Sequence, residues 1–352
     1  MPKLFPASLS PEVSRPLLAE AERIARVAPW EFMSDLELLG MRDEATGRLH
    51  VASILGTLGT MFAVVIYRND AGLRWIHDMA TNRRVPDPDA GLEDMDCLKI
   101  EWCRKKELQK SDLNTLAAAG FKPKGQGPVW PRFESTRPGW YPWGVTDVEA
   151  RLMTELLRKV ARFVCLREKS RPLHKEPLEA LVPIIPAGEE STLRAEDIEW
   201  LPFVPPPAPL PEPVALSACE QESLLKLPIR HDSIVEIVAP LTPTLAFVDE
   251  KEGRPCLARA TIIVDRATHY VLCAKIAHGA APLRDATGPA LTEAFRNAKS
   301  RPERIHVDNA RLAATLRPTC EAIRVPLCQA PLEAAPSAWA EFEEHFSHQR
   351  PR

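Results

Sequence analysis

Aromatic rings and arginines are concentrated in one short segment, GPVWPRFESTRPGWYPWG, which spans Gly127 to Gly144. Planar rings and guanidinium groups stack on nucleic-acid bases and on peptide side chains, so this composition is typical of a binding surface. The residues that would form it are Trp130, Arg132, Arg137, Trp140, Tyr141 and Trp143. The simpler alternative is a proline-stiffened strand and loop whose rings pack on the domain's own sheet, because buried rings contribute strongly to a core.

The other residue types that could do chemistry form no recognisable motif. The eight cysteines include no CxxC pair and no Cys/His spacing typical of zinc. They are therefore expected to be reduced thiols, several of them in the core. Neither a GxSxG nucleophile elbow nor a glycine-rich phosphate loop occurs in the sequence, which has only 15 glycines. We therefore expect no bound cofactor.

Composition excludes several classes of protein. The chain has 352 residues, of which 45% are hydrophobic and 26% charged, and the net charge is −3. These values are typical of globular domains and exclude a coiled coil or a wholly disordered chain. With this charge balance, nucleic-acid binding would need a local basic patch. No apolar run is long enough for a signal peptide or a membrane span, so we expect a cytoplasmic protein that does not enter the membrane.

A proline-rich segment divides the chain. Seven of the twelve residues 202–213 are proline, and proline cannot sit inside a helix or a central strand. The sequence therefore predicts a polyproline spacer at residues 201–214, which could also be a ligand for an aromatic groove. The predicted domains are residues 1–200 and residues 215–352.

The first domain is predicted to be α+β with an antiparallel sheet, since its strand-like runs are separated by short turns. Hydrophobic spacing predicts helices over 11–27, 70–79, 111–119 and 146–166, and strands over 36–42, 49–55, 60–67 and 97–103. The stretch Trp30–Gly56 and the tryptophan-rich segment resemble an uncharacterised bacterial family, known only as a domain of unknown function. That resemblance implies a bacterial origin and brings no activity with it.

The second domain is predicted to be α/β. Strands are expected over 234–238, 244–248, 256–265, 269–277, 304–307 and 325–328, and helices over 289–299, 311–323 and 337–346. The order is a set of antiparallel hairpins followed by crossovers into parallel strands, which indicates a mixed sheet with helices on its faces.

The stretches IIVDRATHYVLCAKIA and RPERIHVDNARLAATLRPTCEAIRVPL resemble the ribonuclease H-like core of transposases and retroviral integrases. The resemblance implies that fold and a set of three carboxylates. They would fall on Asp249, on Asp308 and on Glu343, with Asp265 an alternative for the first and Glu344 for the third. Two Mg²⁺ ions held by these carboxylates would cleave phosphodiesters, with Asp249 and Asp308 as metal ligands.

Several residues depart from that family. Ala310 follows Asn309 where the family has glycine, and residues 230–352 contain 16 Lys and Arg against 15 Asp and Glu, little for a DNA-handling domain. Two hypotheses follow. The first is a non-catalytic protein with a degenerate ribonuclease H-like module that binds a protein partner. The second is a metal-dependent nuclease or strand-transfer enzyme whose partner is nucleic acid.

Overall fold

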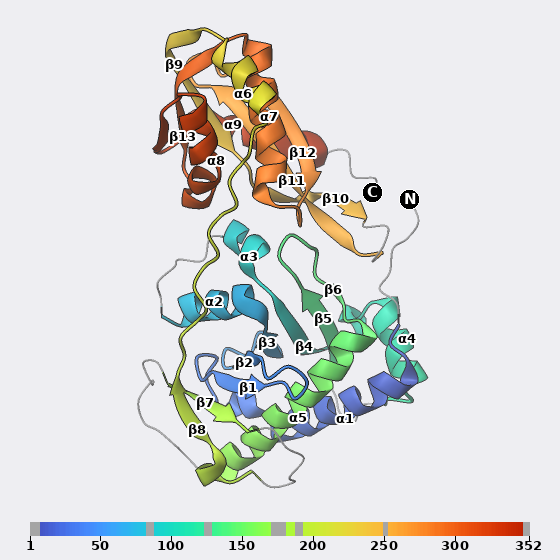
Figure 1. Cartoon of the computed structure of the whole chain (residues 1–352). Coiled ribbons are helices and arrows are strands. Elements are labelled where there is room, and N and C mark those ends of the chain that lie inside the picture. The colour runs from blue at the N-terminus through green and yellow to red at the C-terminus, as the bar shows by residue number, and fades with distance from the viewer. Residues whose placement is uncertain are drawn as a thin grey trace. The chain divides into compact units, whose positions relative to one another are not determined.

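The computed structural model describes residues 8–81, 88–122, 129–169, 181–186, 193–248 and 253–347. The chain forms two structural units, of which the first is drawn mainly in blue to green in Figure 1 and the second mainly in yellow to red. The first unit comprises residues 1–138 and 142–208, and the second comprises residues 139–141 and 209–352. Each unit has its own sheet and its own hydrophobic core, as expected for a chain of this length.

The first unit is built on an eight-stranded sheet in the order β6-β5-β4-β3-β2-β1-β7-β8. All neighbouring strands in it are antiparallel except β1 and β7, which are parallel. The strands are β1 (Leu39–Arg42), β2 (Leu49–Leu55), β3 (Phe62–Tyr67), β4 (Cys97–Cys103), β5 (Trp130–Thr136), β6 (Trp143–Gly144), β7 (Leu181–Ile185) and β8 (Glu199–Pro202).

Helices cover both faces of this sheet. Alternate side chains of the central strands, such as Ile66 and Ile100, pack with α1, α4 and α5 into the main core. Residues of opposite parity, such as Val65 and Tyr67, pack against α2. Figure 1 shows α1 and α5 side by side along the sheet. The helices are α1 (Pro11–Val27), α2 (Asn69–Ala80), α3 (Pro88–Asp94), α4 (Lys110–Ala118) and α5 (Asp147–Lys169), and the 3₁₀ turns are at Pro29–Glu31, Lys105–Glu107 and Ala195–Asp197.

The second unit has a mixed six-stranded sheet. Its strands are β9 (Ile229–Val238), β10 (Leu241–Val248), β11 (Pro255–Asp265), β12 (Val271–His278), β13 (Arg301–Val307) and β14 (Leu327–Gln329). On one side, β11 pairs with β12; on the other, it pairs with β10 along its first half and with β9 along its second half. β13 lies parallel to β9, and β14 lies parallel to β13. The order across the sheet is therefore β12, then β11, then β9 and β10 together on the other side of β11, then β13, and finally β14.

Helices lie on both faces of this sheet as well. α7 (Leu283–Ala298) and α8 (Ala310–Ala322) pack on the face that carries Val235, Ile263 and Ile305. α9 (Ala335–Ser347) packs on the opposite face, against Ile262 and Val264. We call these two surfaces the α7/α8 face and the α9 face. α6 (Ala218–Leu225) packs beside α7.

The predicted fold class is confirmed at the level of mixed α and β structure, with one sheet mainly antiparallel and the other mixed. Residues 201–202, expected in the spacer, instead belong to β8. Pro202 is tolerated there because β8 is an edge strand. α7 begins at Leu283, six residues before its expected start, and includes Pro289 in its interior. No helix in the described part of the chain is long and apolar enough to span a membrane.

Candidate functional site

The first part of the predicted aromatic and arginine surface lies on β5. Trp130 is half-buried against the main core of the first unit, and the ammonium of Lys105 lies 5.2 Å from the centre of its ring. Arg132 donates a hydrogen bond of 2.7 Å to Glu101 and lies 3.9 Å from Glu134. These side chains are engaged within their own domain, which agrees with packing on the sheet. Their use as a binding surface stays a prediction.

The remaining members of that segment divide between the units. In the first unit, Arg137 forms an ion pair of 3.4 Å with Glu149, and Trp143 is half-buried on β6. Trp140 and Tyr141 belong to the second unit. There the ring of Trp140 meets the edge of His278 at 5.4 Å, and the hydroxyl of Tyr141 donates to a backbone carbonyl.

Asp308, the carboxylate at the centre of the nuclease hypothesis, directly follows β13. Its side chain is exposed, and its backbone carbonyl accepts a hydrogen bond of 3.2 Å from the side chain of Gln329. Two residues earlier, His306 pairs across the ladder with Glu236 of β9. Asp308 is therefore accessible to solvent at the carboxyl end of a central strand.

Asp265 does not lie beside Asp308. Asp265 is at the level of Val235 in the neighbouring strand β9, and Val235 is at the level of Ile305 in β13. Asp308 lies three residues beyond that level, about 10 Å along the strand direction, and β9 separates the two strands. Asp265 also shares the parity of Ile263, which faces α7 and α8. The described geometry therefore does not bring these two carboxylates together.

The carboxylate of Asp265 instead closes the turn between β11 and β12. One oxygen accepts hydrogen bonds from the backbone N–H and the hydroxyl of Thr268, at 3.0 and 2.9 Å. The other lies 3.4 Å from both Ser233 and Arg230. Burial alone would raise the pKa of Asp265, but the bonds from Thr268 and the nearby Arg230 lower it. An ionised carboxylate thus stabilises this turn.

Glu343 and Glu344 lie on adjacent positions of α9 and face different surroundings. Glu343 is half-buried and accepts a hydrogen bond of 3.3 Å from the hydroxyl of Thr242 on β10. Glu344 is exposed. Of the two, Glu343 is thus the one that faces the sheet.

Asp249 lies outside the described residues. Val248, which precedes it, pairs with Pro255 of β11. The ladders place Asp308 at the level of Ile262, seven residues further along β11, or about 23 Å. Over the residues that the structure describes, no group of three or more His, Cys, Asp or Glu side chains is arranged to hold a metal ion. The trio that includes Asp249 stays a prediction.

A carboxylate that the sequence analysis did not single out, Glu236, occupies the centre of the α9 face. Its side chain is 0% exposed. Its oxygens accept backbone hydrogen bonds from Glu333 at 3.0 Å, Ala334 at 2.8 Å and Ala335 at 2.9 Å. These are N–H groups at the start of α9, which have no partner within the helix. Arg266 lies 3.8 Å from one oxygen. Glu236 therefore fixes the amino end of α9 to the sheet.

His306 lies next to Glu236, and Cys328 of β14 is at the same level on the other side of His306. The imidazole is 9% exposed, and its Nδ1 has no hydrogen-bond partner among the described residues. Burial lowers the pKa of His306, and the positive charge of Arg266 lowers it further, against the attraction of Glu236. The imidazole is therefore neutral at pH 7. Among the described residues, no hydrogen bond joins the imidazole of His306 to Glu236. Glu236, His306 and Cys328 therefore do not form a proton relay.

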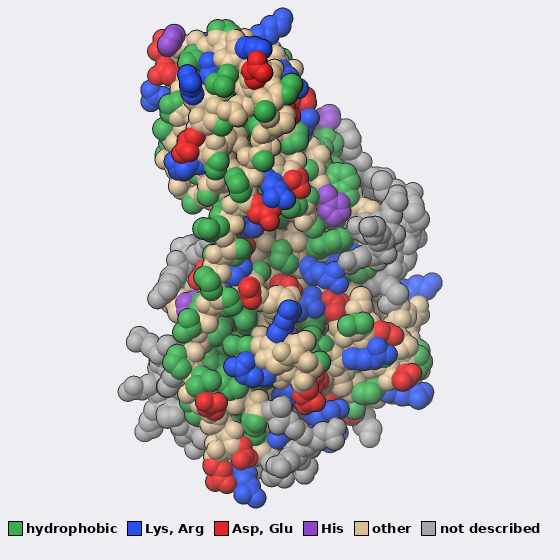
Figure 2. Space-filling model, in the orientation of Figure 1, with side chains coloured by type: hydrophobic (Ala, Val, Ile, Leu, Met, Phe, Trp, Pro, Cys, Tyr) green, Lys and Arg blue, Asp and Glu red, His purple; other side chains and the backbone are tan. Residues whose placement is uncertain are grey.

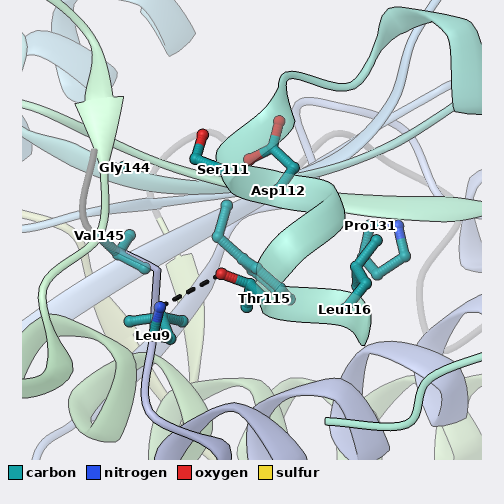
Figure 3. Close-up of a pocket in the computed structure, with 9 residues that line it drawn as sticks. Leu9, Ser111, Asp112, Thr115, Leu116, Pro131, Gly144 and Val145 are labelled. Atoms are coloured by element: carbon teal, nitrogen blue, oxygen red, sulfur yellow. Dashed lines mark hydrogen bonds between the residues drawn. The ribbon is translucent and has the colours of Figure 1, made fainter. Parts of the chain in front are cut away.

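Two hollows in the described part of the chain lie away from these residues. The one in Figure 3, in the first unit, has about 20 Å³ of space and is lined by Ser111, Asp112 and Thr115 among others. Burial raises the pKa of Asp112, and the hydroxyl of Ser111 is buried without a hydrogen-bond partner among the described residues. A space of this size accommodates a water molecule and excludes a substrate.

The second hollow is a groove in the second unit with a volume of about 730 Å³, within the range of small-molecule sites. It runs between residues 213–216, α6, α7 and β12. Its charged side chains are Lys275, Arg284, Arg296, Glu220, Asp285 and Glu293. Figure 2 likewise shows blue and red side chains interspersed on the visible face. Neither surface has the single positive sign that a phosphate backbone requires.

Comparisons with known proteins support two domains without naming an activity. A family model described as a domain of unknown function, DUF7309, matches residues 15–179. A second, DUF6930, also a domain of unknown function, matches residues 220–343. No curated protein matches the chain, and no solved structure matches it. The two matches lie on either side of the proline-rich segment, and the chain is thus a two-domain protein similar in each part to a domain of unknown function.

Proposed function

We propose that this chain is a non-catalytic binding protein whose second unit is a degenerate ribonuclease H-like module. The strand order supports the fold assignment. An antiparallel series of three strands, β12-β11-β9, is followed by two further strands, β13 and β14, parallel to the first. The sequence resemblance implies this same order, with helices between the later strands.

The observation that carries the non-catalytic proposal is the engagement of Glu236. A nuclease of this class needs carboxylate oxygens on adjacent central strands to share two metal ions. On β9, the strand beside Asp308, the carboxylate on the α9 face already accepts three backbone N–H donors and is fully buried. Ligating a metal would leave those donors without acceptors, at a cost of about 1–3 kcal/mol for each buried group.

The distribution of charge supports a protein partner over a nucleic acid. Residues 230–352 are nearly neutral, and the groove of the second unit has cations and anions in equal number. Nucleic-acid affinity depends on a concentration of positive charge that releases counterions, whereas protein interfaces are commonly mixed in charge with a polar rim.

The test is a metal titration and a nuclease assay on the whole chain. We expect the wild-type chain to give no more heat of binding with Mg²⁺ or Mn²⁺ than the control variant Glu341→Ala, which lacks one exposed carboxylate. We also expect no cleavage of single- or double-stranded DNA or RNA. Metal-dependent cleavage by the wild-type chain that is lost in Asp308→Ala but retained in Glu341→Ala would overturn the proposal.

That outcome would instead support the alternative, a metal-dependent nuclease or strand-transfer enzyme. Two observations favour this alternative: Asp308 is exposed at the end of a central strand, and Glu343 faces the sheet. Under this alternative Asp249, Asp308 and Glu343 would hold two Mg²⁺ ions. An Asp249→Asn variant then distinguishes the trio from a site without Asp249, because only the first loses activity.

A further inference from the structure

The outer edge of the second sheet is a long strand with few of the features that usually protect a sheet edge. β12 is eight residues long and pairs, among the described strands, only with β11. Natural edge strands are commonly short, interrupted by proline or lined with charges, because an open edge pairs with other strands. The opposite edge follows that rule, since β14 has three residues. β12 has no proline, its one formal charge is Lys275, and its ladder with β11 is regular from Cys273 to His278, with a shift of register only between Val271 and Cys273.

The backbone groups that point outward from this edge can be identified from the ladder. The N–H of Gly279 donates to the carbonyl of Leu257 at 2.8 Å, so Gly279 faces β11. Because facing alternates along an antiparallel strand, Lys275 and Cys273 also face β11, whereas Ile276 and Ala274 point their N–H and C=O groups away from it.

Apolar side chains accompany these outward groups. Tyr270, just before the strand, is 68% exposed, Val271 is 41% exposed and Ile276 is 40% exposed, while Ala274 is also exposed. Large apolar side chains clustered on an open edge mark an interaction surface more specifically than scattered ones do. We call residues 270–276 the β12 edge.

We propose that the β12 edge is a homodimer interface, in which two copies of this chain pair antiparallel across a two-fold axis at Ala274. The inference does not depend on the proposed function. A strand is the natural partner of a strand edge, and a two-fold axis makes the same edge serve both copies. With the axis at Ala274, the backbone N–H of Ala274 in each copy would donate to the backbone C=O of Ala274 in the other.

Charge complementarity selects the second copy and this register. Glu293 of α7 forms an ion pair of 2.6 Å with Lys275 and also interacts with Cys273, so its carboxylate lies over both. In the proposed register, Lys275 of one copy lies opposite Cys273 of the other, and therefore beside the other copy's Glu293. Each carboxylate would then lie between two ammonium groups. A register centred at Lys275 would instead place two ammonium groups directly opposite each other, which is unfavourable.

The first test is the molar mass of the full chain by light scattering over a concentration series, with the chain mass of 39.2 kDa as reference. We expect a dimer for the wild-type chain and for Ala274→Ser, which keeps the backbone N–H. In Ala274→Pro the dimer should weaken at least about tenfold, because proline removes an outward N–H that the sheet of one copy does not use. An unchanged melting temperature shows that the fold survives. A wild-type monomer, or a dimer unaffected by Ala274→Pro, overturns the proposal.

Charge exchange tests complementarity separately. Lys275→Glu should weaken the dimer because it places four carboxylates together, and the double variant Lys275→Glu with Glu293→Lys should restore it. Because the ion pair is exposed, breaking it within one copy costs little stability. If the double variant stays as weak as the single one, the proposed arrangement of charges is wrong.

A disulfide tests the register. In a background with the exposed Cys219 replaced by serine, Ala274→Cys would place two thiol-bearing residues opposite each other with Cα atoms about 5.5 Å apart, within disulfide range. Ile276→Cys is the matched control, because its two copies would lie about 13 Å apart. We expect oxidation to link the 274 variant alone, as located by peptide mapping. Equal linking of both variants, or linking at 276 only, overturns the register.

Discussion

A buried carboxylate stabilises each of the two units, and the two carboxylates do so in different ways. In the second unit, the N–H groups at the start of α9 donate to the carboxylate of Glu236. Glu236 lies on the strand β9, whereas the usual acceptor at a helix start is a capping residue of the helix itself. In the first unit, Glu149 accepts from the backbone N–H of Thr146 at 2.9 Å and forms an ion pair of 2.9 Å with the buried Arg68. Both carboxylates are less than one-tenth exposed, so each depends on its partners within the protein.

Removing the carboxylate of Glu236 should detach the start of α9. Glu236→Ala leaves the N–H groups of Ala334 and Ala335 buried without acceptors, so we expect a loss of about 3 kcal/mol in the free energy of unfolding of the second unit. Hydrogen exchange should accelerate at residues 333–345. Glu333→Ala is the control, because its side chain is 62% exposed and its loss should cost under about 1 kcal/mol. Equal effects of the two variants would contradict the assigned role.

The pKa of Glu149 predicts how the stability of the first unit responds to acid. Burial alone would raise its pKa, but the N–H of Thr146 and the guanidinium of Arg68 lower it to about 2 from an ordinary value of 4.5. A carboxyl whose pKa is lower in the folded state stabilises the fold above its unfolded pKa. The contribution, about 3 kcal/mol, is therefore complete above pH 4.5 and is lost as pH falls toward 2.

The measurement is urea unfolding of the first unit between pH 2 and 6, followed by hydrogen exchange at α5. Glu149→Gln should flatten the decline in stability below pH 4.5, leaving the part that comes from Asp43, whose pKa is likewise lowered to about 2. Glu22→Gln, at an exposed position, should leave the decline as it is in the wild-type chain. A Glu149→Gln variant with the wild-type pH profile would refute the assignment.

At the scale of elements, the contact between α2 and the start of β4 depends on a glycine. A Cβ atom at Gly72 would lie 2.2 Å from the backbone carbonyl oxygen of Asp96, closer than real atoms approach. Gly72→Ala should therefore shift α2 and destabilise the first unit by about 1–3 kcal/mol, although alanine favours helix. Gly91→Ala in α3 is the matched control, because its Cβ would meet only ordinary contacts, at 3.5 Å from Trp75. Thermal unfolding distinguishes them: a Gly72→Ala variant as stable as Gly91→Ala would contradict this packing.

Local patterns in the sequence predicted many of the elements, because hydrophobic spacing and capping are local properties. The helix expected over 146–166 is α5, which begins one residue later with the capping box of Thr146 and Glu149. β7, by contrast, escaped prediction because Pro183 lies within it, and proline argues against a strand.

The role of Glu236 could not be predicted from sequence for a different reason. Its donors, Glu333 to Ala335, lie 97 to 99 positions away along the chain, so no window of sequence contains both partners. The same limit applies to Asp308 and Asp265, whose separation depends on the register of β11, β9 and β13. A strand-end carboxylate is visible in sequence, whereas its neighbours across a sheet are set by the fold.

At the scale of the molecule, the two units have separate cores, and the chain passes between them at the proline-rich connection and on either side of residues 139–141. The side chain of Leu210, in that connection, is 91% exposed. Phe203 and Val214, near its two ends, are instead buried, one in a core of each unit. Because these cores are separate, a loss of stability in one unit need not reach the other. We expect the two units to respond to mutation as independent structures.

A double variant tests that independence. Glu149→Gln should accelerate hydrogen exchange in α1, α5 and β4 and leave β9, β13 and α9 unchanged, and Glu236→Ala should do the reverse. In the double variant the two losses of unfolding free energy should add within about 0.5 kcal/mol, because residues without shared partners do not couple. The control is the pair Glu149→Gln and Arg68→Ala, which share an ion pair and should be strongly non-additive. Coupling above about 1 kcal/mol between Glu149 and Glu236 would mean that the units unfold as one structure, and each single-residue effect argued above would then have to appear in both sheets.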